Sequence, residues 1–89
     1  MNTLVGDIGN TITKICVIEI NTFEVKKTIF FSSEKIFLKN FLKKKLKFFF
    51  KKGNRCKVAL FSSVVPKFKK VLGDFFKKKY GIRLLEIKE

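Results

Sequence analysis

The chain has 89 residues, enough for one small domain that buries roughly two-thirds of its unfolded surface on folding. Its 46% hydrophobic and 15% aromatic residues exclude a disordered basic tail, so we expect a folded chain. Histidine is absent and the two cysteines, Cys16 and Cys56, lie forty positions apart. This composition excludes His-based acid–base chemistry, a Cys/His zinc site and a disulfide framework.

The net charge of +14 comes entirely from the second part of the chain. Residues 1–34 hold 3 basic and 4 acidic side chains, for −1, whereas residues 35–89 hold 18 basic and 3 acidic ones, for +15. Such an excess is typical of proteins that bind nucleic acid or anionic membranes, but composition alone also produces it. Only Arg55 and Arg83 are arginines, although phosphate and base recognition commonly relies on the planar guanidinium. We therefore favour an A/T-rich genome, which loads a chain with Lys and Phe, over nucleic-acid binding.

The amino terminus lacks the pattern of a signal peptide, because Asp7 and Gly9 interrupt the first apolar run. No uncharged stretch approaches the roughly 18 residues of a membrane span. We therefore expect a cytoplasmic protein without a membrane partner.

Three strand patterns open the chain. Residues 3–8 form a short apolar run, and residues 12–20 are β-branched and apolar on both faces, which predicts a central strand. Residues 23–31 alternate apolar and polar side chains, as a more exposed strand does. The three strands are expected to form an antiparallel meander.

A first helix is predicted after the meander. Ser32 and Ser33 are candidate N-cap residues, and Glu34 suits the positive end of a helix. The helix is expected to end near residues 52–54. Its apolar side chains recur with helical spacing: Leu38, Phe41, Leu42, Leu46 and Phe49.

The second half of the chain predicts strand, helix, strand. Residues 56–61 form an apolar run, Pro66 suits the first turn of a helix, and Gly81 suits its left-handed stop. Residues 82–87 then predict a fifth strand. The helix has a clean apolar stripe: Phe68, Val71, Leu72, Phe75 and Phe76.

The expected order is β-β-β-α-β-α-β, an α/β fold with two helices on a mixed five-stranded sheet. The two helical crossovers should place strands one, four and five parallel to one another. Residues 1–89 read as a single domain. Its last strand ends two residues before the chain does, so no helix follows to cover the sheet beside it, which is an unusual place for a domain to stop.

The segment from Asp7 to Lys14 is the one local pattern with a chemical mechanism. At a strand–turn–strand corner, Gly9 permits positive φ and close backbone approach, so that successive N–H groups at Gly9, Asn10 and Thr11 can face phosphate oxygens. Asp7 can hold Mg²⁺ directly or through water, and Lys14 can place a point charge on a phosphate. Taken alone, however, Gly-Asn between two strands more often marks an ordinary tight hairpin.

Residues 62–66 form a second candidate segment. Ser62, Ser63 and Pro66 follow a strand in an open α/β sheet, where ligands commonly gather. The alternative is that the serines are turn and N-cap donors for the helix that Pro66 begins.

The strand order and these two segments together resemble a known family. A meander whose first hairpin bears Asp-x-Gly-x-Thr, followed by β-α-β-α-β, resembles the ribonuclease H-like amino-terminal domain of the acetate and sugar kinase, Hsp70 and actin superfamily. Within it, Asp7-Ile8-Gly9-Asn10-Thr11 with Lys14 looks like the opening motif of type III pantothenate kinases. Ser62-Ser63-Val64-Val65-Pro66 looks like the second block of the same family.

The resemblance implies ATP-dependent phosphorylation of pantothenate, the first step of coenzyme A synthesis, by a homodimer that uses Mg²⁺ and a monovalent cation, K⁺ or NH₄⁺. It implies an ATP-phosphate site at Asp7, Ile8, Gly9, Asn10, Thr11, Ile12, Thr13 and Lys14. Its candidate substrate-cleft residues are Ser62, Ser63, Val64, Val65 and Pro66.

The family's Gly-x-Asp-Arg segment, which supplies the catalytic Asp, has no counterpart in the 89 residues. We therefore expect an incomplete actin-like ATPase domain that is inactive alone. The competing hypothesis is a small basic module that binds nucleic acid or an anionic membrane surface through residues 35–79.

Overall fold

The computed structural model describes residues 2–47, 58–63 and 65–87, and for Ser63 it describes the main chain alone. The strands and helices follow one another in the order that the sequence predicts, with a 3-10 helix before the first α-helix. They are β1 (Asn2–Ile8), β2 (Ile12–Glu19), β3 (Val25–Ser32), the 3-10 helix η1 (Ser33–Phe37), α1 (Lys39–Leu46), β4 (Val58–Ser63), α2 (Pro66–Tyr80) and β5 (Arg83–Glu86).

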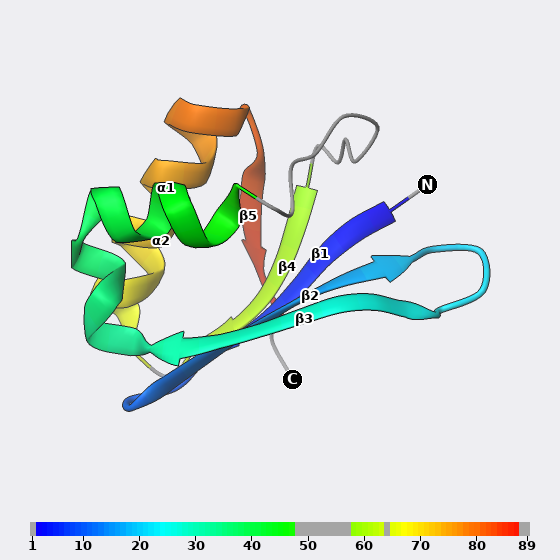
Figure 1. The fold of residues 1–89 in the computed structure, drawn as a ribbon, viewed down its shortest axis with the longest axis horizontal. Coiled ribbons are helices and arrows are strands. Elements are labelled where there is room, and N and C mark those ends of the chain that lie inside the picture. The colour runs from blue at the N-terminus through cyan, green and yellow to red at the C-terminus, as the bar shows by residue number, and fades with distance from the viewer. Residues whose placement is uncertain (1, 48–57, 64, 88–89) are drawn as a thin grey trace.

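The described strands form one mixed sheet in the order β3-β2-β1-β4-β5 (Figure 1). β1 is antiparallel to β2 and β2 to β3, so the first three strands make the expected meander. β4 lies parallel to β1, and β5 lies parallel to β4. The predicted α/β topology, with strands one, four and five parallel, is therefore confirmed.

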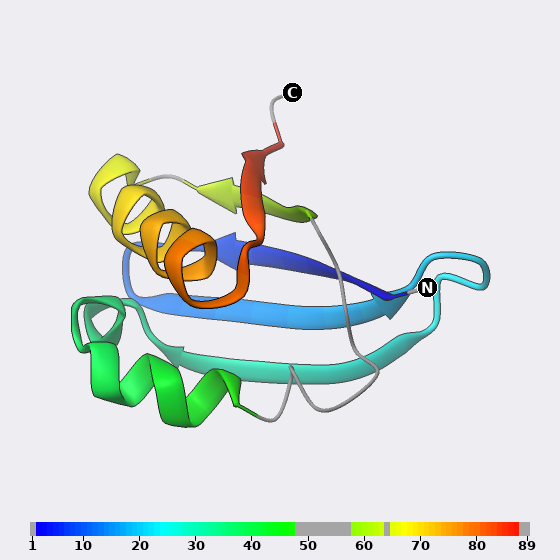
Figure 2. The ribbon, with the colours of Figure 1, turned by 90° about the horizontal axis from the view of Figure 1, so that it is seen from above.

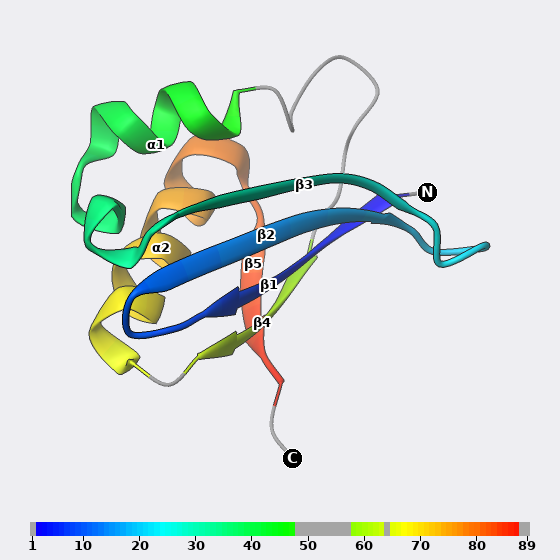
Figure 3. The ribbon, with the colours of Figure 1, turned by 60° about the horizontal axis from the view of Figure 1, so that its bottom comes forward.

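One face of the sheet packs against η1, α1 and α2, which lie on the same side of it (Figure 3). Alternate residues of each strand point to this face because side chains along a strand alternate between faces. Each large apolar side chain buried there contributes about 1.5–3 kcal/mol relative to exposure. The buried core consists of Leu4, Ile8, Ile15, Val17, Phe31, Ile36, Leu42, Leu46, Ala59, Phe61, Phe68, Leu72, Phe76 and Ile82.

The opposite face of the sheet carries no helix within the described residues. Val5 of β1 pairs with Cys16 of β2 and with Leu60 of β4 in one row across this face. Leu60 keeps 38% of its surface exposed. In the next row Asp7 pairs with Lys14, so the predicted phosphate segment lies at an accessible end of the open face.

The sequence predicts one continuous first helix, but in the structure this helix is interrupted at Leu38. A 3-10 turn, η1, precedes the break, and Leu38 itself is extended with φ −99° and ψ 96°. Its side chain is 52% exposed, so its expected place on the buried stripe is wrong, whereas Leu42 and Leu46 are buried as expected. Ser32 occupies the N-cap position of η1 as expected but makes no side-chain capping hydrogen bond, and Ser33 is buried. Phe49 and the predicted helix end lie outside the described residues.

The second helix agrees closely with the sequence. Pro66 occupies the first helical position of α2, where its missing N–H has no partner to lose. Gly81 ends α2 in the left-handed conformation, with φ 67°. The Gly81 N–H donates to the Lys77 carbonyl at 3.1 Å, and the next N–H donates to the Phe76 carbonyl at 3.2 Å. Both boundaries of this helix are therefore confirmed.

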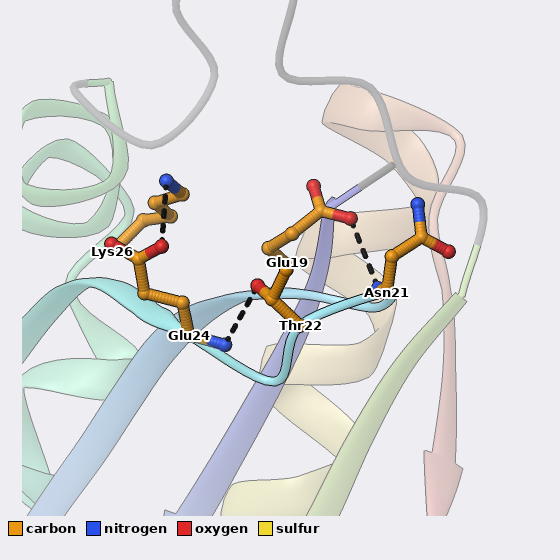
Figure 4. A network of polar contacts seen from close by, with 5 residues as sticks. All are labelled: Glu19, Asn21, Thr22, Glu24 and Lys26. Carbon is orange, nitrogen blue, oxygen red and sulfur yellow. Dashed lines mark hydrogen bonds and ion pairs between the residues drawn. The ribbon is translucent and has the colours of Figure 1, made fainter.

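The turn between β2 and β3 differs from the expected strand that begins at Phe23. This turn protrudes at the end of the sheet remote from the helices (Figure 2). Phe23 has a positive φ of 58° and is 80% exposed, and β3 begins only at Val25. The turn is held by its own polar groups instead (Figure 4): the Glu24 N–H donates to Thr22 Oγ1 at 3.3 Å, and Glu24 pairs with Lys26 at 3.3 Å.

Glu19 supplies a pH-dependent contact in this turn. The Asn21 N–H donates to Glu19 Oε1 at 3.0 Å and thereby lowers the pKa of the Glu19 carboxyl below its ordinary value of 4.5. Stability from this bond is present above the ordinary pKa and is lost as pH falls through the lowered one. We expect a carbon-13 NMR titration to show Glu19 titrating below 4.5, and the stability advantage of the wild type over Glu19→Gln to shrink as pH falls through that range. A Glu19 carboxyl that titrates at or above 4.5 contradicts this prediction.

Candidate functional site

The hairpin between β1 and β2 is closed by one short main-chain hydrogen bond. The Gly9 N–H donates to the Ile12 carbonyl at 3.0 Å. A Cβ atom on Gly9 would lie 2.9 Å from the same carbonyl oxygen, so the close approach requires glycine. The expected positive φ at Gly9 is wrong, because among the described glycines positive φ occurs at Gly81. The close approach that Gly9 permits here is to the hairpin's own Ile12 carbonyl, as in an ordinary tight hairpin.

The exposed tip of the hairpin offers main-chain donors. Asn10 and Thr11 are both exposed. No backbone acceptor within residues 2–47, 58–63 and 65–87 receives a hydrogen bond from their N–H groups. Of the three amides expected to face a phosphate, Gly9's is therefore used in closing the turn, whereas those of Asn10 and Thr11 are open to an anionic ligand.

Asp7 stands at the carboxyl end of β1, beside two other polar side chains. Its register partner on β2 is Lys14, and its register partner on β4 is Ser62. Residues paired in this way point to the same face, and directly opposite Cβ atoms lie about 4.5–5.5 Å apart in an antiparallel pair. Lys14 also lies over the ring of Phe30, with Nζ 5.8 Å from the ring centroid. A carboxylate, an ammonium and a hydroxyl thus share one end of the open face.

Three further residues of the phosphate segment lie differently. Ile8 and Thr13 are fully buried and point into the core, so only their main-chain atoms can reach a ligand. Ile12 is 51% exposed at the end of the hairpin.

The second candidate segment is only partly assembled near Asp7. Ser62 is half-buried beside it, and the main chain of Ser63 pairs with Ile8. The N-cap position of α2 is occupied by Val65, without a side-chain capping bond, rather than by either serine. Pro66 instead lines a groove between α2 and β5. Val64 lies outside the described residues.

The described residues contain no cluster of three or more Cys, Asp or Glu side chains that could hold a metal ion. Asp7 has no second carboxylate among its register partners, which are Lys14 and Ser62. This fits Mg²⁺, which commonly binds one or two carboxylates and takes its remaining ligands from phosphates and water. In the part of the chain that the structure describes, no helix has the length and hydropathy needed to cross a bilayer.

Two residues that build this corner were not expected from the sequence. Gly6 precedes Asp7, and a Cβ atom there would overlap the buried ring of Phe61. A glycine inside an apolar strand is a known signal of such close approach. Ser33, expected as a helix cap, instead hydrogen-bonds the Gly9 carbonyl. No local signal marks this contact, because its partners are 24 positions apart.

Comparisons with known proteins identify the family. The family model described as type III pantothenate kinase matches residues 3–89. The type III pantothenate kinase of Pelagibacter ubique (strain HTCC1062) is 39% identical over 89 residues, covering 97% of this chain and 34% of that protein. The chain thus spans about a third of the length of this curated relative.

A solved structure supports the fold independently. The Lmo2764 protein of Listeria monocytogenes, provisionally assigned as an N-acetylmannosamine kinase, superposes with a TM-score of 0.58 at 15% identity. The match covers 97% of this chain and 34% of that one, and it fits an actin-like ATPase domain. The match of the family model over residues 3–89, beside the 39% identical relative, shows that the chain belongs to the type III pantothenate kinase family.

Proposed function

We propose that this chain supplies the ATP-phosphate-binding part of an enzyme that phosphorylates pantothenate with ATP. The observation that carries the proposal is the grouping of Asp7, Lys14 and the open amides of Asn10 and Thr11 at one exposed end of the sheet. A hairpin that served only to reverse the chain would need neither the carboxylate nor the ammonium. Family membership gives this grouping its chemistry.

Each group has a distinct task towards the nucleotide. The N–H groups of Asn10 and Thr11 donate to phosphate oxygens, and Lys14 places a positive charge beside them. Asp7 holds Mg²⁺ directly or through water. When bound, Mg²⁺ would neutralise charge on the phosphate oxygens. Ser62, on the β4 side of Asp7, lies at the same end of the open face, and we assign it to the substrate side of the site.

Transfer of the phosphoryl group requires more than these residues. The 89 residues contain no Gly-x-Asp-Arg sequence, and none of the other acids in the described residues pairs with Asp7 across the sheet. We therefore propose that the chain binds phosphate but does not catalyse transfer alone. The family resemblance extends the proposal to a homodimer and a K⁺ or NH₄⁺ ion in the complete enzyme.

The excess of lysine has a structural explanation. Lys43, Lys44 and Lys45 lie in the last turn of α1, and Lys77, Lys78 and Lys79 lie in the last turn of α2. Positive side chains are stabilising there because the carboxyl end of a helix carries partial negative charge. Because this placement accounts for these lysines without a ligand, binding of nucleic acid or anionic lipid ranks second among the candidate functions. A steep salt dependence of binding would reveal it.

Two measurements test the proposal. In the first, MgATP is titrated into the nitrogen-15-labelled chain, and the amide signals of Asn10 and Thr11 are expected to shift with saturation. In the second, these 89 residues replace the matching third of the Pelagibacter kinase, and the resulting graft is expected to phosphorylate pantothenate. Unshifted hairpin amides, together with a folded graft that is inactive, would overturn the proposal.

A further inference from the structure

Ser33 hydrogen-bonds the hairpin between β1 and β2 from its buried side. It is the first residue of η1 and is fully buried. Its Oγ donates to the Gly9 carbonyl at 2.7 Å, and its N–H donates to the Thr11 carbonyl at 2.8 Å. One residue thus holds the two carbonyls that flank Asn10.

Thr13 completes this arrangement. Its Oγ1 lies 2.7 Å from Ser33 Oγ, and it too is fully buried. A hydroxyl has one hydrogen, and Ser33 uses its own on the Gly9 carbonyl, which can only accept. Thr13 is therefore the donor of the second bond, and the two bonds form a chain from Thr13 through Ser33 to Gly9. Such chains strengthen each member because each bond polarises the next.

The geometry of the peptide bond carries this contact to the ligand side. In a planar trans peptide the C=O and the following N–H point in opposite directions. Because Ser33 draws the Gly9 carbonyl inward, the N–H of Asn10 must point outward, away from the core. This accounts for the open amide of Asn10 at an exposed position.

We propose that Ser33, supported by Thr13, is a positioning residue that aims the Asn10 N–H at the nucleotide phosphates. The inference rests on the proposed function, since it assigns that amide a ligand. It adds a buried residue, 24 positions from Gly9, to the determinants of phosphate affinity. Ser33 touches no ligand, and its side chain acts through the Gly9 carbonyl.

The test compares Ser33→Ala with Ser32→Ala in the full 89-residue chain. Ser32 is the matched control because it is the adjacent serine and makes no side-chain capping bond. In Ser33→Ala we expect the Gly9 and residue-33 amides to exchange with deuterium about tenfold faster, since a buried hydrogen bond is lost. The affinity for MgATP, followed at the Asn10 amide signal, is expected to fall about tenfold. Thr13→Val, which leaves the Ser33–Gly9 bond in place, should show both effects more weakly.

A second control separates positioning from general destabilisation. Leu72→Ala removes a core side chain of α2 that belongs neither to the hairpin nor to the hydrogen bonds from Thr13 through Ser33 to Gly9. A folded Ser33→Ala with wild-type affinity overturns the proposal, as does an equal loss in Ser32→Ala or in Leu72→Ala. If Ser33→Ala does not fold, Thr13→Val decides by the same criteria. A wild-type chain that binds no MgATP overturns the assignment of a nucleotide to the Asn10 amide, and an inactive graft would then overturn the proposed function as well. Faster exchange in Ser33→Ala would still show that Ser33 holds the hairpin, so the failure would lie with the ligand and not with the hydrogen bonds.

Discussion

Asp7→Asn in the graft should lower the rate of pantothenate phosphorylation by about 10²–10³, the cost of removing one aligned electrostatic group from a transfer site. The substitution keeps the size of the side chain and removes the negative charge that would hold Mg²⁺. Because Asp7 is exposed on the open face, its replacement should leave the unfolding midpoint nearly unchanged. Steady-state rates at saturating ATP, measured beside thermal unfolding, check both expectations.

Glu24→Gln is the matched control for this prediction. It also removes one negative charge from the acidic first part of the chain, but Glu24 lies in the turn between β2 and β3 and pairs with Lys26. We expect it to retain the rate of the parent graft. An Asp7→Asn graft that also retains that rate would remove Asp7 from the phosphate site.

Gly6→Ala is expected to destabilise the fold by about 1–3 kcal/mol, the usual cost of forcing extra volume into a packed core. Gly6 and Phe61 are register partners on β1 and β4, and the ring of Phe61 covers the position where a Cβ atom would lie. Neither partner moves easily, since Phe61 is fully buried and packs against Phe76 with ring centroids 5.8 Å apart. Urea unfolding of the chain, with the slope unchanged, measures the effect.

The double variant Gly6→Ala/Phe61→Leu tests the cause. A smaller side chain at position 61 makes room for the new methyl group, so the two effects should be less than additive. Gly73→Ala is the control. Gly73 lies inside α2, and a Cβ atom there would meet the side chain of Leu84 at an ordinary 3.7 Å. It should stabilise the chain by about 0.5–1 kcal/mol. Additive losses in the double variant would contradict the proposed overlap.

Elements with strong local signals followed the sequence closely. Pro66 begins α2 and Gly81 ends it, as expected, because each acts through the conformational restrictions of its own backbone. The corner from Asp7 to Lys14 was recognisable for a similar reason, since its motif is continuous in the sequence. The assignment of a ligand to that corner came from the family pattern, which periodicity alone does not contain.

Elements that depend on distant partners did not follow it. Helical spacing predicted one helix across Leu38, yet the chain there is extended after η1. The rings of Phe37 in η1 and Phe68 in α2 pack with their centroids 5.3 Å apart. η1 therefore packs against α2, and it does not continue into α1. Such a contact joins residues far apart in the chain and leaves no trace in local periodicity.

The amino-acid sequence by itself determined the order of strands and helices, the mixed sheet and the hairpin between β1 and β2, because these follow from side-chain periodicity and from the restricted backbones of glycine and proline. Tertiary structure alone decided which amides of the hairpin face outward. That choice depends on Ser33 reaching the Gly9 carbonyl from the far end of β3, and on Thr13 donating to Ser33. A hydrogen bond between residues 24 positions apart forms only once the sheet has brought them together.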